Sequence, residues 1–169
     1  MRTRAMMFLL LLIGVMLAGA GAWWYSRRPL PAPEQERTVL LYFYDLARDT
    51  DVDGNTRCGA TGLVAVKREI PQSARPVMKE TIDLLLEGKL MPDEKARGIT
   101  TEFPLQGVEL ISAQVDEGGD VTLVFNDPQH RTSGGACRVG ILRAQIEATA
   151  RQFVSAGEVL LMPEELFQP

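Results

Sequence analysis

An uncharged stretch of 21 residues near the amino terminus, residues 5–25, sets the first limit on the architecture. As an α-helix it would be about 31 Å long, which matches the hydrocarbon thickness of a lipid bilayer. It ends in Trp23, Trp24 and Tyr25, and aromatic side chains of this kind are enriched at the membrane–water interface. The sequence therefore predicts a single transmembrane helix that anchors the domain behind it.

The same stretch also fits a cleavable secretory leader. Small residues at 18–20 and at 20–22 satisfy the small-x-small rule for cleavage after Ala20 or Ala22. The unbroken apolar run and its aromatic end favour an uncleaved signal-anchor, with residues 1–4 as a cytoplasmic tail. We therefore expect a single-pass protein of the cell membrane with an extracytoplasmic domain, or a secreted domain if the leader is removed.

Residues 26–37 are rich in proline and predict a short, stiff linker ahead of a domain formed by residues 38–169. A domain of that length buries roughly two-thirds of the surface of its unfolded chain. It carries 20 acidic and 13 basic side chains, a net charge of −7. Because an acidic surface repels phosphate backbones, nucleic acid is not an expected partner.

Five stretches of the chain have strand patterns. Residues 38–44 are apolar on both alternations, as in a strand covered on nearly both faces, and residues 63–66 predict its antiparallel partner. Residues 108–115 and 121–125 flank an Asp-Glu-Gly-Gly-Asp turn and predict a β-hairpin. Residues 158–162 predict a last strand.

Two helices are expected between these strands. Ser73 is a candidate cap for the first, which has Pro76 in its first turn and ends at Gly88. A single helical turn is expected at residues 92–98, and the second helix spans residues 137–156. The order β-β-α-β-β-α-β predicts an α+β fold of two layers, a mostly antiparallel sheet with both helices on one face. The apolar stripes are Met78, Ile82, Leu85 and Leu86 in the first helix and Val139, Leu142, Ile146 and Phe153 in the second.

Several apolar, charged and glycine positions resemble the GerMN domain of sporulation and spore-germination proteins. They are residues 63–66, 68–71 and 85–88, Glu94, residues 98–101, Pro104, residues 121–123, Gln145 and Ile146. The resemblance covers nearly all of residues 38–162. It implies a bacterial extracytoplasmic domain on a membrane anchor or lipoprotein that serves envelope assembly or binding, and it supplies no catalytic residue and no cofactor.

Cys58 and Cys137 are the two cysteines of the chain. An exported domain enters an oxidising compartment, so we predict that they form a disulfide. A different interpretation makes Cys137 the nucleophile of an exported hydrolase or thiol enzyme, with His130 as its base. A disulfide removes that nucleophile, so the two interpretations exclude each other.

Asp49, Asp51 and Asp53 form the sharpest local motif. Alternate carboxylates followed by glycine resemble the first half of a calcium loop, in which oxygen ligands wrap a hard cation. The twelfth position, where that motif requires a bidentate glutamate, is Ala60. The loop is therefore either a solvated acidic turn or part of a calcium-dependent adhesion module.

Taken together, these features predict a non-catalytic, membrane-anchored domain that binds a cell-envelope protein or a peptidoglycan component. We expect no cofactor, and the residues that contact the ligand are not identified by the sequence. The thiol-enzyme and calcium-module hypotheses remain as alternatives.

Overall fold

The computed structural model describes residues 16, 23, 35–154 and 157–169. The chain divides into two units, Met1–Glu34 and Gln35–Pro169, and the second carries the folded domain. Apart from Met16 and Trp23, the predicted transmembrane helix lies outside the described residues. Among the residues that are described, no helix is both long and apolar enough to cross a membrane.

The first sheet has the strand order β2-β1-β3. β1 (Glu36–Asp45) pairs antiparallel with β2 (Leu63–Pro71) along its whole length, which confirms the predicted pair. The short β3 (Ile99–Thr100) joins the other edge of β1 at its end. Valine, leucine and phenylalanine at alternate positions of β1 are buried, whereas Leu40 and Tyr42 on the opposite face are only partly covered.

The second sheet has the order β4-β5-β6. β4 (Glu109–Val115) and β5 (Val121–Asn126) form the predicted hairpin, with a register irregularity at Ile111. β6 (Val159–Met162) lies parallel to β5, because the chain returns through a helix between the two strands.

The helical elements differ in part from those expected. They are α2 (Leu46–Asp49), η1 (Ala60–Gly62), α3 (Val77–Leu86), α4 (Pro92–Ala96) and α5 (Ala136–Arg151). The expectation that Ser73 caps the first long helix is wrong, because Pro76 occupies the N-cap position of α3 without a side-chain cap. α5 ends at Arg151 rather than residue 156, and Gln152 is its C-cap. Gly88 ends α3 with a φ of +63°, as glycine readily does.

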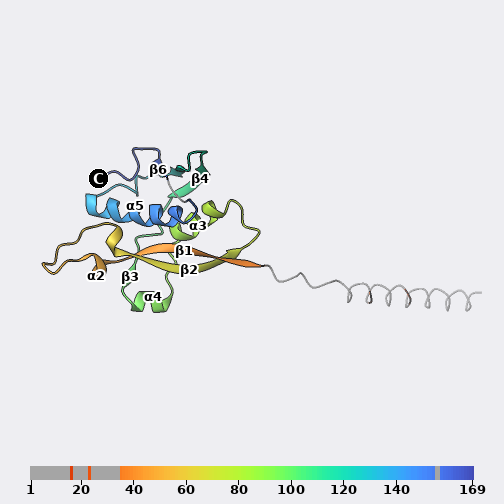
Figure 1. The fold of residues 1–169 in the computed structure, drawn as a ribbon, viewed down its shortest axis with the longest axis horizontal. Coiled ribbons are helices and arrows are strands. Elements are labelled where there is room, and N and C mark those ends of the chain that lie inside the picture. Colours follow the sequence, from red (N-terminus) through yellow and green to blue (C-terminus); the bar gives the residue numbers. More distant parts are fainter. Residues whose placement is uncertain (1–15, 17–22, 24–34, 155–156) are drawn as a thin grey trace, which may run out of the picture. The chain divides into compact units, whose positions relative to one another are not determined.

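The expectation of one sheet with both helices on a single face is therefore wrong. α3 contacts both β1 and β4, and α5 contacts both β1 and β6, so the helices lie between two separate sheets (Figure 1). The physical reason is that each helix is buried on more than one side. In α5, for example, Gln145 and Thr149 are as inaccessible as Leu142 and Ile146. Strand periodicity shows which face of a strand is buried but not which strands share a ladder.

One core fills the space between the sheets. It joins side chains from both sheets, α3 and α5, and its largest fully buried members include Phe43, Ile82, Leu123 and Leu142. The prediction that Leu166 and Phe167 pack back on the body is confirmed, since they are 3% and 1% exposed. The Phe167 ring meets Phe125 edge to face with 5.2 Å between ring centroids.

The C-terminal end of α5 covers the part of the β1 edge that β3 leaves open. The Gln152 side chain accepts a hydrogen bond from the Leu40 N–H (2.9 Å) and donates one to the Leu40 carbonyl (2.7 Å). Thr149 Oγ1 accepts from the Tyr42 N–H at 3.1 Å. The amide of Gln152 thus makes the two bonds that a peptide group of a neighbouring strand would make, and it satisfies an edge that would otherwise attract other strands.

Replacing Gln152 with alanine is expected to lower the free energy of unfolding by about 1–3 kcal/mol, because both backbone groups of Leu40 lose their partner. Chemical denaturation of the full chain measures the change. Arg151→Ala, at the exposed preceding residue, is the control. Equal denaturation midpoints for the two variants would show that the edge contact contributes nothing to stability.

Candidate functional site

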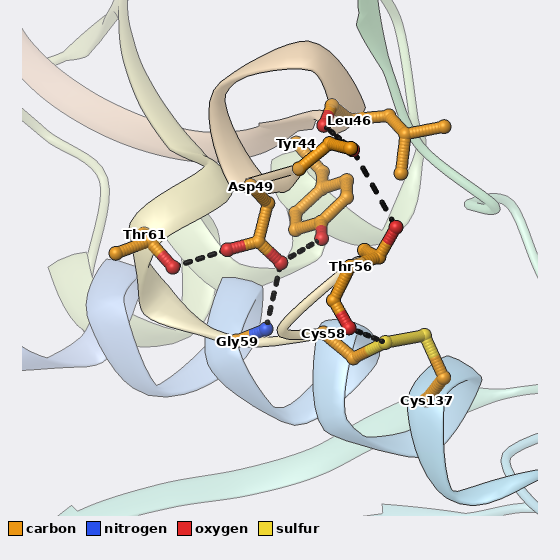
Figure 2. The surroundings of a disulfide bond; sticks show 9 residues. Tyr44, Leu46, Asp49, Thr56, Cys58, Gly59, Thr61 and Cys137 are labelled. Atoms are coloured by element: carbon orange, nitrogen blue, oxygen red, sulfur yellow. Dashed lines mark hydrogen bonds between the residues drawn. A yellow bond between two sulfur atoms is a disulfide. The ribbon is translucent and has the colours of Figure 1, made fainter. Parts of the chain in front are cut away.

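The two cysteines join the loop after α2 to the first turn of α5 (Figure 2). The Cα atoms of Cys58 and Cys137 are 4.9 Å apart, and 79 positions separate them in the sequence. The loop lies directly on the helix, since a Cβ atom at Gly140 would come within 2.7 Å of the Cys58 carbonyl oxygen. The sulfur of Cys137 is therefore bonded and is not a free thiol nucleophile in this structure.

Asp49 lies beneath the same loop and is only 1% exposed. Its carboxylate accepts hydrogen bonds from the Tyr44 hydroxyl, the Thr61 hydroxyl and the Gly59 N–H (Figure 2). Burial alone would raise the pKa of Asp49, but these donors outweigh burial and the pKa lies below its usual range. Burial, the hydrogen bond to Asp49 and its negative charge all raise the pKa of Tyr44.

The three aspartates of the acidic motif have different surroundings. Asp51 accepts from the backbone N–H groups of Asp53 and Asn55, each at 2.9 Å, and so closes its own turn, while Asp53 is exposed. Asp49 faces inward. In the described part of the chain, no three histidine, cysteine or acidic side chains are grouped to hold a metal. Calcium binding by this loop stays a hypothesis. The sequence motif did not reveal that Asp49 accepts hydrogen bonds inside the fold.

His130 stands in a loop that a second buried carboxylate organises. Asp127 accepts from the Arg131 N–H (2.9 Å) and from both the N–H and the hydroxyl of Thr132 (2.8 Å each). Burial opposes ionisation, yet these donors hold the pKa of Asp127 below its usual range. His130 itself is exposed and has a φ of +51°. The thiol-enzyme alternative thus has an exposed histidine but no free sulfur to pair with it.

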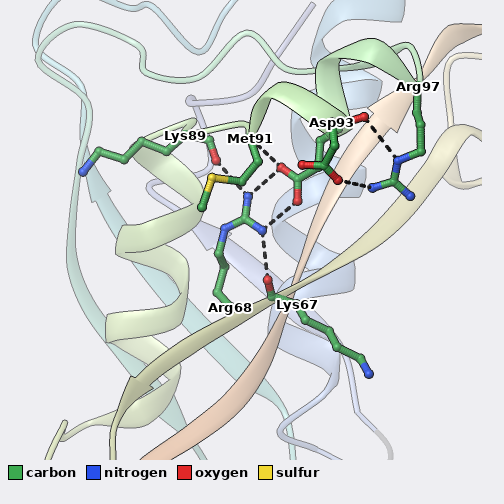
Figure 3. Close-up of polar contacts among 7 residues, drawn as sticks. Lys67, Arg68, Lys89, Met91, Asp93 and Arg97 are labelled. Atoms are coloured by element: carbon green, nitrogen blue, oxygen red, sulfur yellow. Dashed lines mark hydrogen bonds and ion pairs between the residues drawn. The ribbon is translucent and has the colours of Figure 1, made fainter.

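A third carboxylate fixes the segment between α3 and β3 (Figure 3). The Glu94 side chain is 5% exposed. Its carboxylate accepts hydrogen bonds from both terminal nitrogens of Arg68, at 2.8 and 2.7 Å, and from the Met91 N–H at 2.8 Å. The same guanidinium donates to the carbonyls of Lys67 and Lys89, each at 2.9 Å. The hydrogen bonds from Arg68 hold the pKa of Glu94 below its usual range, against the effect of burial. Arg68 and Glu94, two positions of the GerMN resemblance, therefore have a structural task.

Two open hollows adjoin at the exposed side chain of Leu46, near the disulfide loop. Their volumes are about 680 and 260 Å³. Leu46 is 53% exposed, and the surrounding groups are mainly carboxylates, hydroxyls and one guanidinium. We call this surface the Leu46 hollow; its lining includes Asp45, Thr50, Asp51, Arg97, Thr100, Thr101 and Glu102. It offers contact area for a partner without an evident reactive group.

The geometry defines a small α+β domain in which two sheets enclose two helices and the buried carboxylates hold loops in place. Residues 40–164 match the family model described as Germane, sporulation and spore germination. The chain therefore belongs to the Germane family, and the GerMN-type resemblance predicted from the sequence is confirmed. Membrane anchoring is not part of this match and stays a prediction.

The fold is similar to a solved structure of the tandem GerMN domains of the sporulation protein GerM from Bacillus subtilis. The TM-score is 0.50 and the identity 20%, and the match covers 84% of this chain and 44% of that one. The chain thus corresponds to less than half the length of that structure, and the likeness concerns the fold. No curated protein matched the sequence.

Removing the disulfide with the paired substitutions Cys58→Ser and Cys137→Ser is expected to lower the free energy of unfolding by about 2–4 kcal/mol, since a long loop in the unfolded chain is released. Denaturation of the oxidised parent and the double variant measures the difference. A parent whose stability is unchanged by a reducing agent would contradict this prediction.

Glu94→Gln is expected to lower the free energy of unfolding at neutral pH, and to lower it less in acid. Because the pKa of folded Glu94 is depressed, its contribution to stability is complete above the ordinary glutamate pKa of 4.5 and is lost as the pH falls through the lower folded value. The stabilities of variant and parent, measured by denaturation across this range, should converge below pH 4.5. Glu80→Gln, at an exposed position of α3, should run parallel to the parent at every pH.

Proposed function

We propose that this protein is a non-catalytic, membrane-anchored domain that binds a component of the cell envelope on the extracytoplasmic side. The Germane membership supports a task in sporulation, germination or a related envelope process. The apolar stretch at residues 5–25 supports the anchor, and the cysteine pair supports an oxidising compartment. The partner in this proposal is an envelope protein or a peptidoglycan component.

The observation that carries the proposal is that the side chains most suited to catalysis, a cysteine and three buried carboxylates, already bind other groups of the protein. Cys137 is bonded to Cys58, and the carboxylates of Asp49, Asp127 and Glu94 are each occupied by protein donors. General acids, bases and nucleophiles must instead face a substrate. What the described surface offers to another molecule is shape, charge and exposed apolar side chains.

Site-specific photo-crosslinking in cells that make the full chain tests this function. A photoreactive amino acid placed at Leu46, which is 53% exposed, or at Leu160, which is 45% exposed, should yield a discrete crosslinked envelope protein or cell-wall fragment. The same probe at the buried Leu142 is the control, because it faces the core and should give no intermolecular product.

Either of two results would contradict the proposal. One is the absence of any crosslink from the surface positions at normal expression levels. The other is turnover of a cell-wall substrate by the purified full chain that survives the paired substitution of Cys58 and Cys137. Either result would move the protein out of the class of binding domains.

A further inference from the structure

We propose that the outer face of the β4–β5–β6 sheet binds a protein segment that presents an apolar strip flanked by lysine or arginine side chains. This inference rests on the proposed function, and it names the surface and the chemical class of the partner. The outer face is formed by the side chains of Glu109, Ser112, Gln114, Thr122, Val124, Asn126, Leu160 and Met162, and the exposed Ile111 adjoins it at the register irregularity of β4.

The strand register places these side chains opposite the core. In β5 the alternate residues Val121, Leu123 and Phe125 are at most 3% exposed, so Thr122 and Val124 point the other way. Pairing then aligns Gln114, Thr122 and Leu160 in one row and Ser112, Val124 and Met162 in the next. α3 and α5 both lie on the core side of this sheet, toward β1 and β2 (Figure 1).

The outer face carries an apolar strip, formed by Val124, Leu160 and Met162, and its charged side chain in β4 is the acidic Glu109. Leu160 is 45% exposed, and Ile111 at the irregularity of β4 is 54% exposed. An antiparallel sheet with one solvated face normally alternates apolar and polar residues, and exposed strands usually carry charges that discourage association. An apolar strip with an exposed leucine on such a face therefore indicates a contact surface.

The segments that contain the three strands of this face carry charges of one sign. Residues 99–130 and 157–169, which contain all three strands, include nine aspartates and glutamates and no lysine or arginine. Glu109, Asp116, Glu117 and Glu158 are exposed at the ends of the strands. After residue 98, the arginines lie instead in residues 131–151, in and just before α5.

The apolar strip and the acidic side chains around it together indicate which kind of molecule can bind to this face. A second copy docked face to face would bring two acidic rims together, and like charges across an interface are unfavourable. Anionic lipid and nucleic acid are repelled for the same reason. A segment with apolar side chains between lysines or arginines gains both burial and attraction at this face. The partner is therefore a basic protein segment rather than an identical subunit.

Titration of the full chain in nanodiscs of neutral lipid tests the surface directly. The probes are two fluorescent strand peptides, one alternating valine with lysine and one alternating valine with glutamate. Anisotropy should report binding of the lysine peptide only, and added salt should weaken it because the rim is solvent-exposed. Leu160→Gln should weaken binding by about tenfold, the effect of losing about 1.4 kcal/mol of contact.

Matched variants separate this face from the rest of the surface. Leu46→Gln changes a leucine of similar exposure at the Leu46 hollow and should leave the affinity unchanged. Glu117→Lys, at the rim, should weaken binding, whereas Glu80→Lys on α3 should have little effect. Equal effects of Leu160→Gln and Leu46→Gln, or equal binding of both peptides, would overturn the proposal.

Two further results would also overturn it. One is a dimer of the parent in sedimentation that Leu160→Gln dissociates, since the occupant would then be a second copy. The other is Leu160-dependent binding to vesicles of phosphatidylglycerol. Crosslinks to an envelope component from Leu46 but none from Leu160 would leave the binding function standing and refute this surface, so the two failures are distinguishable.

Discussion

The attachment of α5 to the first sheet is the constraint on which the rest of the domain depends. At its C-terminal end, Gln152 and Thr149 hydrogen bond to the backbone of β1. At its N-terminal end, Cys137 is tied to the loop that connects β1 with β2. A helix held at both ends along a strand edge leaves its other sides free to carry the second sheet. This explains why a small domain can have two sheets and one core.

The sequence alone predicts the local elements well and their assembly poorly. Apolar, β-prone runs identified β1 and β2, and a glycine turn between alternating residues identified the β4–β5 hairpin. It did not separate the two sheets, since that depends on α5 burying polar residues such as Gln145 and Thr149 as well as apolar ones. Nor did it show that Gln152 replaces a strand, because a glutamine after a helix usually faces water.

The candidate sites show a similar division. A pair of cysteines in an exported domain predicts the disulfide on chemical grounds. The acidic motif does not reveal that Asp49 turns inward to Tyr44 and Thr61 while Asp51 closes a turn. The outer face of the second sheet carries a visible sequence signal, namely a long stretch without lysine or arginine. That signal acquires meaning only when the register gathers Val124, Leu160 and Met162 on one side.

The parallel pairing of β6 has a consequence for biogenesis. Until residues 159–162 are available, β5 has neighbours on one edge only, and its alternating valines, leucine and phenylalanine form a short, strongly β-prone segment. A nascent or truncated chain that stops before β6 therefore exposes a template for aggregation just as its core begins to form. The second sheet is therefore complete only after almost the whole domain has been synthesised.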